Sequence, residues 1–374
     1  MIYLTYNDAP SGIYYSQVVD VVKYLNNIQS KEKVKLVALI SARNYFANKK
    51  KLKEKLPDSI VLPMFPGVSN WKRNLFLLKM TGIFASHKTI MARGPFAAYL
   101  ALKLKDSGNC SKVIFDARGA YKAELNEYNV VDDPIIKSEI AALEQDVLRR
   151  SDKILAVSNA LVNYWKEDCS FTSSKHVVIP CTLSDDFIFS FPHEYELKNI
   201  KKEAGFAEDD IVMVYSGSSA GWQSFSLVEE LMGKIMELNP KVKLLWLTHN
   251  LNTQSAFVIK YKSRIVTNWL KPSDVRKYLL AADYGILFRE QTVTNKVASP
   301  VKFAEYLSCG LKIIISNNLG DFTQFATENN VGFGVEEMNQ IQSATYSEKL
   351  RCHALALKHL TKENFKNQYL SLLD

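Results

Sequence analysis

A short helical segment with two charged side chains one turn apart carries the clearest chemical signal in the chain. Ser299 is a typical N-cap, and Pro300 suits the first helical turn. The backbone N–H groups of Val301 and Lys302 would then point ahead of the helix. Because a helix start carries roughly half a positive charge and Lys302 adds its own, a diphosphate could bind there. Glu305 follows on nearly the same face, where its carboxylate could accept both hydroxyls of a ribose.

The residues on either side of this helix fit a ligand-binding edge. Gly310 is expected to end the helix, and residues 311–315 form a strand apolar enough to be buried on both faces. Asn295, in the polar loop before the helix, could contact the same ligand or simply cap a turn. The alternative for Lys302 and Glu305 is an exposed helical ion pair. The complete segment favours a ligand.

A second candidate is the turn at residues 215–223, which follows a predicted strand. Gly217 lets the backbone approach a ligand, and the hydroxyls of Ser218 and Ser219 can donate hydrogen bonds to phosphate oxygens. Any connection from a strand to a helix can use such residues. The turn therefore supports a phosphate site only together with other evidence.

Arg289 ends another predicted strand, at the edge where open parallel sheets bind ligands. With Lys302, it could stabilise the charge of a departing phosphate if no metal is present. The alternative is a surface ion pair between Arg289 and Glu290.

In the first half of the chain, Asp116 and Arg118 lie just past a predicted strand. Asp116 could orient an acceptor hydroxyl or merely pair with Arg118, and Arg118 could bind a departing phosphate or an acidic acceptor. Arg93 ends the preceding strand and Gly12 lies in the first loop, which makes both candidates for acceptor binding. Arg93 could equally be a surface cation.

Short apolar runs alternate with helical patterns along the chain, which predicts parallel sheets covered by helices. The length of 374 residues fits two domains. We therefore predict an α/β protein with two doubly wound domains. The predicted strands are residues 2–6, 34–40, 59–63, 89–92, 112–116, 153–156, 176–179, 211–216, 243–248, 265–266, 284–288 and 312–316.

The segment from Asn295 to Leu307 resembles family 4 glycosyltransferases of polysaccharide assembly, in which Asn-x-Val-Ala-Ser-Pro-x-Lys-Phe precedes Glu-Tyr-Leu. Glu305 matches the second glutamate of the family signature, and Val297 replaces the first. The stretches AVSNALVNYW, VVIPCTLSDDFIF and VIFDARGAYKAE are also similar to family segments. Many relatives have an arginine after the glycine of the phosphate turn and a lysine a few residues on, where this chain has Ser218 and Trp222.

The resemblance implies a GT-B fold, with two Rossmann-like domains facing across a cleft. An acceptor domain would span residues 1–190 and a donor domain 191–350, and a C-terminal helix within 351–374 would cross back to the first. It also implies a retaining transfer from a nucleotide sugar to a glycan or lipid-linked acceptor in capsule, O-antigen or exopolysaccharide synthesis. The alternatives are a GT-B epimerase or phosphorylase, and a non-catalytic subunit that binds a nucleotide sugar.

Composition limits the remaining possibilities. The 5 scattered cysteines and the absence of a signal-peptide pattern predict a cytoplasmic protein. The 6 histidines show no metal-ligand spacing, so we expect neither a metal nor another cofactor. No nucleic-acid-binding motif accompanies the net charge of +8.

The positive charge is concentrated in the first half, where residues 1–190 hold 26 Lys and Arg against 19 Asp and Glu. The run KKKLKEK and the stretch 71–88, which interleaves aromatic and basic residues, fit an anionic membrane surface. The alternative is that the lysine run is a solvated helix face and the aromatic residues belong to the core.

Overall fold

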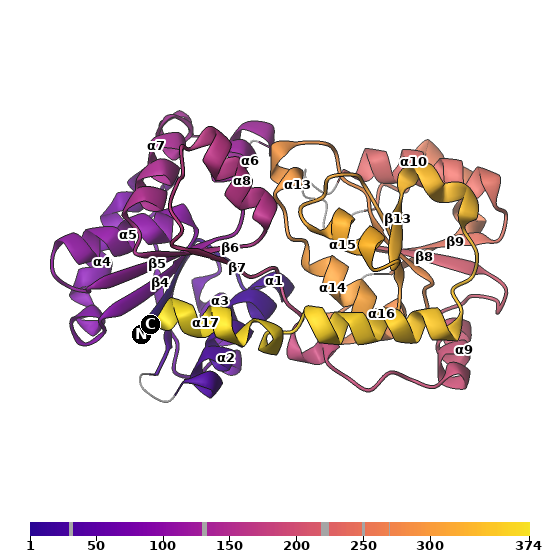
Figure 1. Ribbon diagram of the computed structural model, residues 1–374, viewed down its shortest axis with the longest axis horizontal. Helices are drawn as coiled ribbons and strands as arrows, with labels where there is room; N and C mark the ends of the chain where they lie inside the picture. Colours follow the sequence, from indigo (N-terminus) through magenta and orange to yellow (C-terminus); the bar gives the residue numbers. More distant parts are fainter. Residues whose placement is uncertain (30–32, 129–132, 218–223, 249–250, 269) are drawn as a thin grey trace. The chain divides into compact units, whose positions relative to one another are not determined.

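The computed structural model describes residues 1–374 except 30–32, 129–132, 218–223, 249–250 and 269 (Figure 1). The chain forms two compact units. Unit 1 comprises residues 1–182 and 365–374, and unit 2 comprises residues 183–364. The chain therefore passes from unit 1 to unit 2 between Thr182 and Leu183, earlier than the predicted boundary near residue 190.

Seven parallel strands of the described chain form the sheet of unit 1, in the order β3-β2-β1-β4-β5-β6-β7. The strand order reverses between β1 and β4, as in other doubly wound sheets. The strands are β1 (Ile2–Tyr6), β2 (Lys35–Ile40), β3 (Ile60–Pro63), β4 (Thr89–Arg93), β5 (Lys112–Ala117), β6 (Lys153–Ala156) and β7 (His176–Val178).

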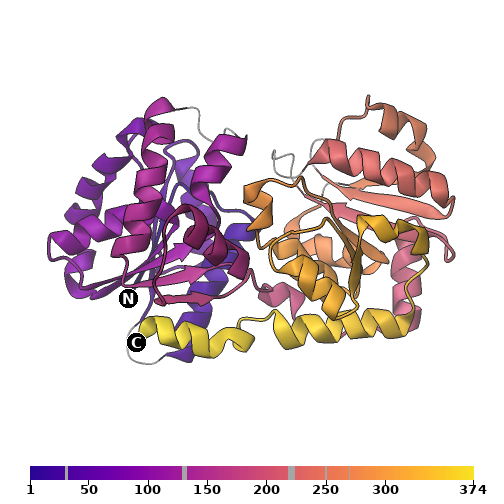
Figure 2. The ribbon, with the colours of Figure 1, turned by 45° about the horizontal axis from the view of Figure 1, so that its top comes forward.

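Helices cover both faces of this sheet (Figures 1 and 2). One face packs against α2, α3 and α17, and α5 packs on β4 and β5 with α7 beside it. The helices are α1 (Gly12–Tyr14), the π-helix η1 (Tyr15–Val19), α2 (Asp20–Ile28), α3 (Tyr45–Lys55), α4 (Asn74–Met80), α5 (Gly94–Asp106), α6 (Tyr121–Tyr128), α7 (Pro134–Arg150), α8 (Asn159–Asp168) and α17 (Lys366–Leu373).

The sheet of unit 2 has six parallel strands among the described residues, in the order β10-β9-β8-β11-β12-β13. Here the order reverses between β8 and β11. The strands are β8 (Ile211–Ser216), β9 (Val242–Leu247), β10 (Ile265–Asn268), β11 (Tyr284–Leu287), β12 (Lys312–Ile315) and β13 (Gly332–Gly334).

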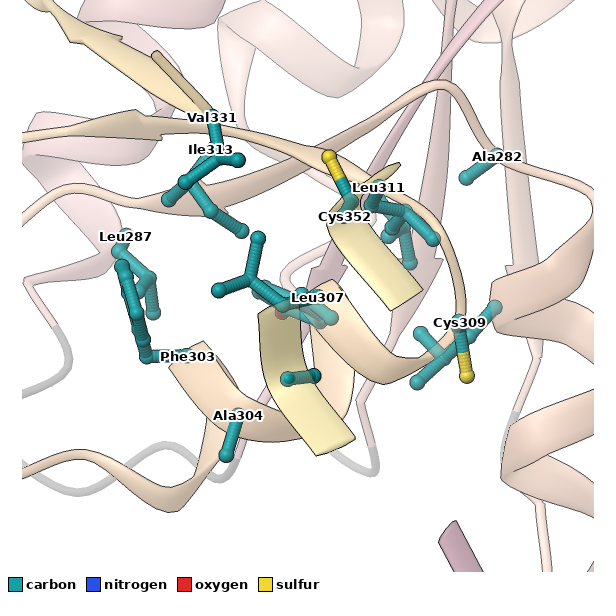
Figure 3. Packing of buried hydrophobic residues seen from close by; sticks show 14 of the residues in the cluster. Ala282, Leu287, Phe303, Ala304, Leu307, Cys309, Leu311, Ile313, Val331 and Cys352 are labelled. Carbon is teal, nitrogen blue, oxygen red and sulfur yellow. The ribbon is translucent and has the colours of Figure 1, made fainter. Parts of the chain in front are cut away.

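Two apolar clusters bury the faces of this second sheet. One joins the strands to α14 and α16, and Figure 3 shows Phe303 and Leu307 of α14 packed near Leu287 and Ile313. The other packs under α10. The helices of unit 2 are α9 (Glu194–Glu203), α10 (Phe225–Leu238), α11 (Ala256–Lys260), α12 (Pro272–Leu280), α13 (Val293–Lys296), α14 (Val301–Ser308), α15 (Phe322–Glu328) and α16 (Tyr346–His359).

The C-terminal stretch divides between the two units. Helix α16 belongs to unit 2, where Cys352 and Ala356 lie in the core beside α14. Only α17 belongs to unit 1, where Tyr369 and Leu372 are buried. The chain therefore re-enters unit 1 at Phe365 rather than at residue 351, because the apolar face of α16 is part of the core of unit 2.

Candidate functional site

The polar residues predicted in the second half gather where the strand order of unit 2 reverses. Ser216 ends β8 and Arg289 follows β11, its neighbour in the sheet. In open α/β sheets, ligands bind outside the carboxyl ends of the strands at such a point. The loop and helix start that follow β11 belong to the same edge.

Helix α14 begins one residue later than predicted. Pro300 is the N-cap, with φ −68° and ψ 121°, and its carbonyl accepts the N–H of Phe303 at 3.0 Å. The extended ψ of Pro300 keeps it out of the helix, so Ser299 lies one position before the cap. The N–H groups of Val301 and Lys302 still come before Phe303, whose N–H makes the first hydrogen bond of the helix, as an anion site at this helix start requires.

Lys302 and Glu305 form an ion pair on the first turns of α14. The lysine Nζ lies 2.8 Å from Oε2 of Glu305, and the side chains are 26% and 11% exposed. The pair agrees with the predicted shared face and also with the alternative of a helical ion pair. Since the glutamate is largely buried and the lysine is partly open, a ligand that bound here would meet the lysine first.

Tyr306 ties α14 to the end of β8, and sequence reasoning missed it. Its ring is fully buried, and its hydroxyl accepts the backbone N–H of Ser216 at 2.9 Å. Burial raises the pKa of the Tyr306 hydroxyl well above its ordinary value, so it stays protonated. A Cβ on Gly285 of β11 would overlap the ring. The sequence offered one signal for this contact, the glycine at position 285 within a predicted strand, which leaves room for a large side chain beside it.

Arg289 is buried, with 6% exposure, so a surface pair with Glu290 does not describe it. Its Nη1 donates to the carbonyl of Phe288 at 2.8 Å, and its backbone N–H donates to the hydroxyl of Ser316 at 2.9 Å. Burial raises the pKa of Tyr215 to about 12, while the nearby Arg289 charge opposes that rise. Arg289 thus lies buried at the expected strand end.

Asn295 holds the loop that connects Arg289 to α14. Its side-chain amide donates to the carbonyl of Glu290 and to the hydroxyl of Thr292, each at 3.1 Å. It is 3% exposed, which favours the turn-capping interpretation over ligand contact. Val297, at the position of the family's first glutamate, is also buried.

Of the predicted phosphate turn after β8, the structure describes Gly217, whose N–H donates to the carbonyl of Leu247 at 3.2 Å. Ser218, Ser219 and Trp222 lie outside the described residues.

In unit 1, the predicted residues Asp116, Arg118 and Arg93 form one charged cluster beside the point where the strand order reverses. The carboxylate of Asp116 lies 3.2 Å from Arg118 Nη1 and 3.6 Å from Arg93 Nη1. It is 1% exposed and also accepts the hydroxyl of Tyr3. Burial, followed by the charge of Asp116, raises the pKa of Tyr3 well above its ordinary value.

Two further side chains complete the cluster, and sequence reasoning missed both. Asp8, which follows β1, lies 3.3 Å from Nε of Arg93 and is 40% exposed. Gln17, in the π-helix η1, accepts from Nη2 of Arg118 at 3.0 Å and donates to the carbonyl of Thr182 at 2.8 Å. Because these contacts join distant parts of the sequence, no local pattern marked them.

Arg118 is therefore held from several directions. Its Nη2 also lies 3.2 Å from Sγ of Cys181. Burial alone would lower the pKa of Arg118, but the Asp116 charge reverses this effect and holds the pKa above its ordinary value. The pairing of Asp116 with Arg118, one of the two predicted alternatives, is present. Gly12 is exposed at the start of α1 with open space around it.

A buried carboxylate on α7 fixes the loop that carries Arg118. Glu144 accepts the backbone N–H groups of Tyr121 and Lys122, at 3.3 and 3.2 Å, at the start of α6. The hydroxyl of Tyr121 accepts the N–H of Arg118 at 3.3 Å. Burial raises the pKa of Glu144 to about 7, and the two N–H groups partly offset this rise.

Among the residues that the structure describes, no group of three His, Cys, Asp or Glu could hold a metal ion. In the same part of the chain, no helix is both long enough and apolar enough to cross a membrane.

No protein-family model and no curated protein sequence matches the chain. Solved structures do. HepE (Alr3699) of Anabaena in complex with UDP matches with a TM-score of 0.72 and 12% identity, over 100% of this chain and 99% of that one. HepE has also been solved with UDP-glucose, at a TM-score of 0.70.

Two further solved structures match the chain over nearly its whole length. Sucrose-phosphate synthase of Thermosynechococcus elongatus matches with a TM-score of 0.66 and 13% identity, over 100% of this chain and 98% of that one. WaaG, a glycosyltransferase involved in lipopolysaccharide biosynthesis, matches with a TM-score of 0.66 and 11% identity, over 97% and 98%. With the two parallel-sheet units, these matches confirm the predicted GT-B fold class.

Proposed function

We propose that the protein is a retaining glycosyltransferase that moves a sugar from a nucleotide-sugar donor to a glycan or lipid-linked glycan. The observation that carries this proposal is the start of α14, where Lys302 and Glu305 lie at the ligand-binding edge of the unit 2 sheet. The UDP and UDP-glucose bound by HepE support the same donor class. We further propose that the reaction belongs to surface-polysaccharide assembly in the cytoplasm, without a metal.

The donor would bind unit 2. Backbone N–H groups at Val301 and Lys302 would hold the diphosphate beside the Lys302 charge, with Ser299 next to them. Glu305 would leave its lysine partner to accept the ribose hydroxyls. The other proposed donor contacts are Pro300, Gly217, Ser218 and Ser219, while Asn295 would hold the loop before α14 in place for the donor.

In the reaction, the bond between the anomeric carbon and the diphosphate oxygen would break as the acceptor oxygen forms a new bond to that carbon. The acceptor proton would pass to the departing phosphate. Lys302 and Arg289 would stabilise the growing negative charge. Substitution on the front face, as the family resemblance implies, would retain the anomeric configuration.

The acceptor would bind unit 1, with Gly12, Arg93 and Arg118 as its proposed contacts and Asp116 as the group that orients its hydroxyl. The positive charges of both arginines are already balanced by Asp8 and Asp116. We therefore favour the hydroxyl groups of a sugar over an acidic group as the part of the acceptor recognised here. The basic surface of unit 1 would keep the protein on the inner face of an anionic membrane.

One observation favours a second function. The buried Val297 cannot replace a glutamate in acid–base or hydrogen-bonding chemistry. A GT-B subunit that binds a nucleotide sugar without transferring it would tolerate that residue. Such a protein would bind a donor but release neither nucleotide nor transferred sugar, even with acceptor-containing extracts.

A thermal-shift screen with UDP-, GDP-, CMP- and dTDP-sugars tests the donor site, because a ligand that binds the native state raises its melting temperature. We expect one base to give a selective shift and Glu305→Ala and Lys302→Ala each to weaken affinity about tenfold, or ~1.4 kcal/mol. Glu230→Ala is the matched control, since Glu230 pairs with Lys234 at 2.6 Å on the solvent-facing side of α10, where both side chains are exposed. Unchanged affinity in both α14 variants would overturn the donor-site assignment.

A further inference from the structure

Unit 1 exposes a basic and apolar face on one short helix. Phe76 and Met80 of α4 lie one turn apart and are 62% and 70% exposed. Lys79 of α4 is exposed as well, and so are Lys72 and Arg73, which end the 3-10 helix (Val68–Arg73) that leads directly into α4. We call these five residues the α4 face.

The orientation of this face is fixed by buried neighbours. Trp71, just before α4, is buried against Phe96 and Tyr99, with ring centroids 5.0 Å away in each case. Asn74 is buried as well, and its side chain accepts the N–H of Phe65 at 3.0 Å and donates to the carbonyl of Trp71 at 2.9 Å. Helix α4 therefore cannot turn Phe76 and Met80 inward without breaking these contacts.

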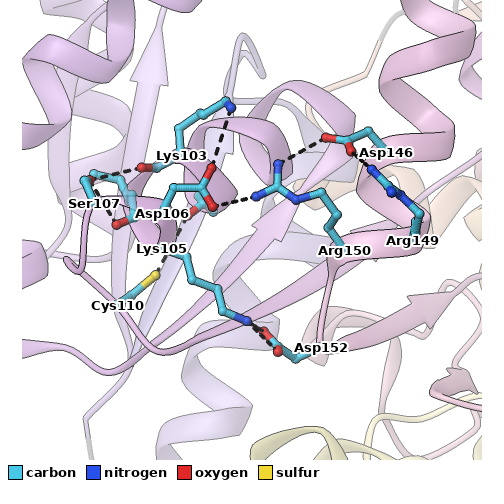
Figure 4. Close-up of polar contacts among 11 residues, drawn as sticks. Lys103, Lys105, Asp106, Ser107, Cys110, Asp146, Arg149, Arg150 and Asp152 are labelled. Carbon is cyan, nitrogen blue, oxygen red and sulfur yellow. Dashed lines mark hydrogen bonds and ion pairs between the residues drawn. The ribbon is translucent and has the colours of Figure 1, made fainter.

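The segment of the chain that carries the α4 face is basic. Residues 59–105 contain no Asp or Glu. Lys72 reaches Glu139 of α7 at 2.8 Å, but within the described parts of the chain no carboxylate lies within ion-pair distance of Arg73 or Lys79. The end of α5 differs, because its charges are paired there: Lys105 lies 2.6 Å from Asp152, and Asp106 lies 2.6 Å from Arg150 at the end of α7 (Figure 4).

We propose that the α4 face binds an anionic lipid bilayer, with Phe76 and Met80 entering the interface and the basic side chains meeting the lipid headgroups. Two apolar side chains form too small a patch for a stable protein interface. Apolar anchors beside Arg73 and Lys79, which no carboxylate of the described residues neutralises, suit an anionic membrane. The proposed function supplies only the reason for membrane binding, which is access to a lipid-linked acceptor. Of the aromatic residues in the stretch 71–88, Trp71 and Phe84 are core, so only Phe76 serves here.

Vesicle co-sedimentation of the full chain tests the proposal. We expect binding to phosphatidylcholine vesicles that contain phosphatidylglycerol, weak binding to phosphatidylcholine alone, and a decline as salt is raised. The double variant Phe76→Ser/Met80→Ser and the charge variant Arg73→Glu/Lys79→Glu should each bind at least tenfold more weakly. Leu238→Ser is the matched control, because Leu238 is 62% exposed in unit 2 beside Glu237, and its binding should not change.

Three results would overturn the proposal: equal binding to neutral vesicles, unchanged binding of the serine double variant, and a wild-type dimer that the serine variant converts to monomers. The last would assign the face to a second copy of the chain. Since both serine substitutions are at exposed positions, melting temperatures should match the wild type. Vesicle binding is measured without a donor, so its failure is separate from failure of the nucleotide-sugar screen.

Discussion

Each sheet collects polar side chains near the point where its strand order reverses, but the two sets are held differently. In unit 1, Asp116 is buried and shared by Arg93, Arg118 and Tyr3. In unit 2, the ionic contact at the helix start is the partly open pair of Lys302 and Glu305.

The difference in burial indicates that the unit 1 cluster stabilises the fold, whereas the unit 2 pair is available to bind a ligand. A carboxylate that neutralises two largely buried arginines is part of the fold, because its loss leaves charges away from water. A partly exposed ion pair contributes little to stability and can exchange one partner for a ligand at small cost. We therefore expect substitutions in the unit 1 cluster to change stability first, and substitutions on α14 to change binding first.

Asp116→Asn gives the strongest test of this contrast. We expect the free energy of unfolding to fall by about 3 to 5 kcal/mol, because Arg93 and Arg118 lose their shared counter-charge. Urea unfolding measures the change. Asp106→Asn is the control, since Asp106 is 45% exposed in its pair with Arg150, and it should cost less than about 1 kcal/mol. If the two variants were equally stable, Asp116 would not be the structural centre of unit 1.

Glu144→Gln tests whether unit 1 also depends on a buried carboxylate outside the cluster. Burial raises the pKa of Glu144 from 4.5 to about 7, so the native state holds its proton more tightly than the unfolded chain. Its contribution is fully present below pH 4.5 and is lost as the pH rises through 7. This loss should reach about 3 kcal/mol in the wild type.

The amide of Glu144→Gln cannot titrate. Between pH 5 and pH 8, the free energy of unfolding should therefore fall less in the variant than in the wild type. Unfolding curves across that range measure the difference. Glu139→Gln, at a 38% exposed side chain on the same helix, should follow the wild type. Parallel curves for Glu144→Gln and the wild type would show that Glu144 does not supply this pH dependence.

Gly285→Ala sharpens the account of unit 2, where packing rather than charge positions the helix. Its methyl group would overlap the ring of Tyr306, so we expect a loss of about 1 to 3 kcal/mol and weaker donor binding as α14 shifts. Chemical unfolding and nucleotide-sugar titration measure the two effects.

Two variants serve as controls for Gly285→Ala. Gly233→Ala on α10 should be neutral or slightly stabilising, since a Cβ there would meet Phe257 at an ordinary 3.8 Å. Tyr306→Leu alone should be destabilising, because the N–H of Ser216 loses its acceptor. Combined with Gly285→Ala, it should cost less than the sum of the two single losses, since the clash is relieved, whereas additive losses would mean that the ring is not the source of the clash.

The sequence patterns predicted the parallel-sheet architecture because buried strands are continuous apolar runs. Of the thirteen strands that the structure describes, twelve lie close to their predicted positions, from Ile2–Tyr6 to Lys312–Ile315. The missed strand, Gly332–Gly334, has three residues and two glycines, and so shows no periodicity. The start of α14 was misplaced by one residue because Ser299 and Pro300 fit either of two adjacent cap positions.

The sites were predicted less completely because their contacts join distant residues. Asp116 and Arg118 were found together because they are two positions apart. Tyr3 lies 113 positions from its partner Asp116, and the hydroxyl of Tyr306 meets a backbone group 90 positions away. Asp8, Gln17 and Glu144 occur in segments without a recognisable motif, so only the folded chain reveals their partners.

Gln17→Met is the finest test of the unit 1 cluster, because it removes one polar contact from Arg118 and leaves Asp116 in place. We expect a loss of about 1 kcal/mol, since the hydrogen bonds to Arg118 and Thr182 disappear while the side chain keeps its volume. Gln324→Met, at an exposed side chain bonded to Glu328, should be neutral. Urea unfolding of the combined Gln17→Met/Asp116→Asn variant then measures the coupling. If Arg118 connects the two residues, the combined loss should differ from the sum of the single losses, whereas additivity would mean that Gln17 and Asp116 act independently.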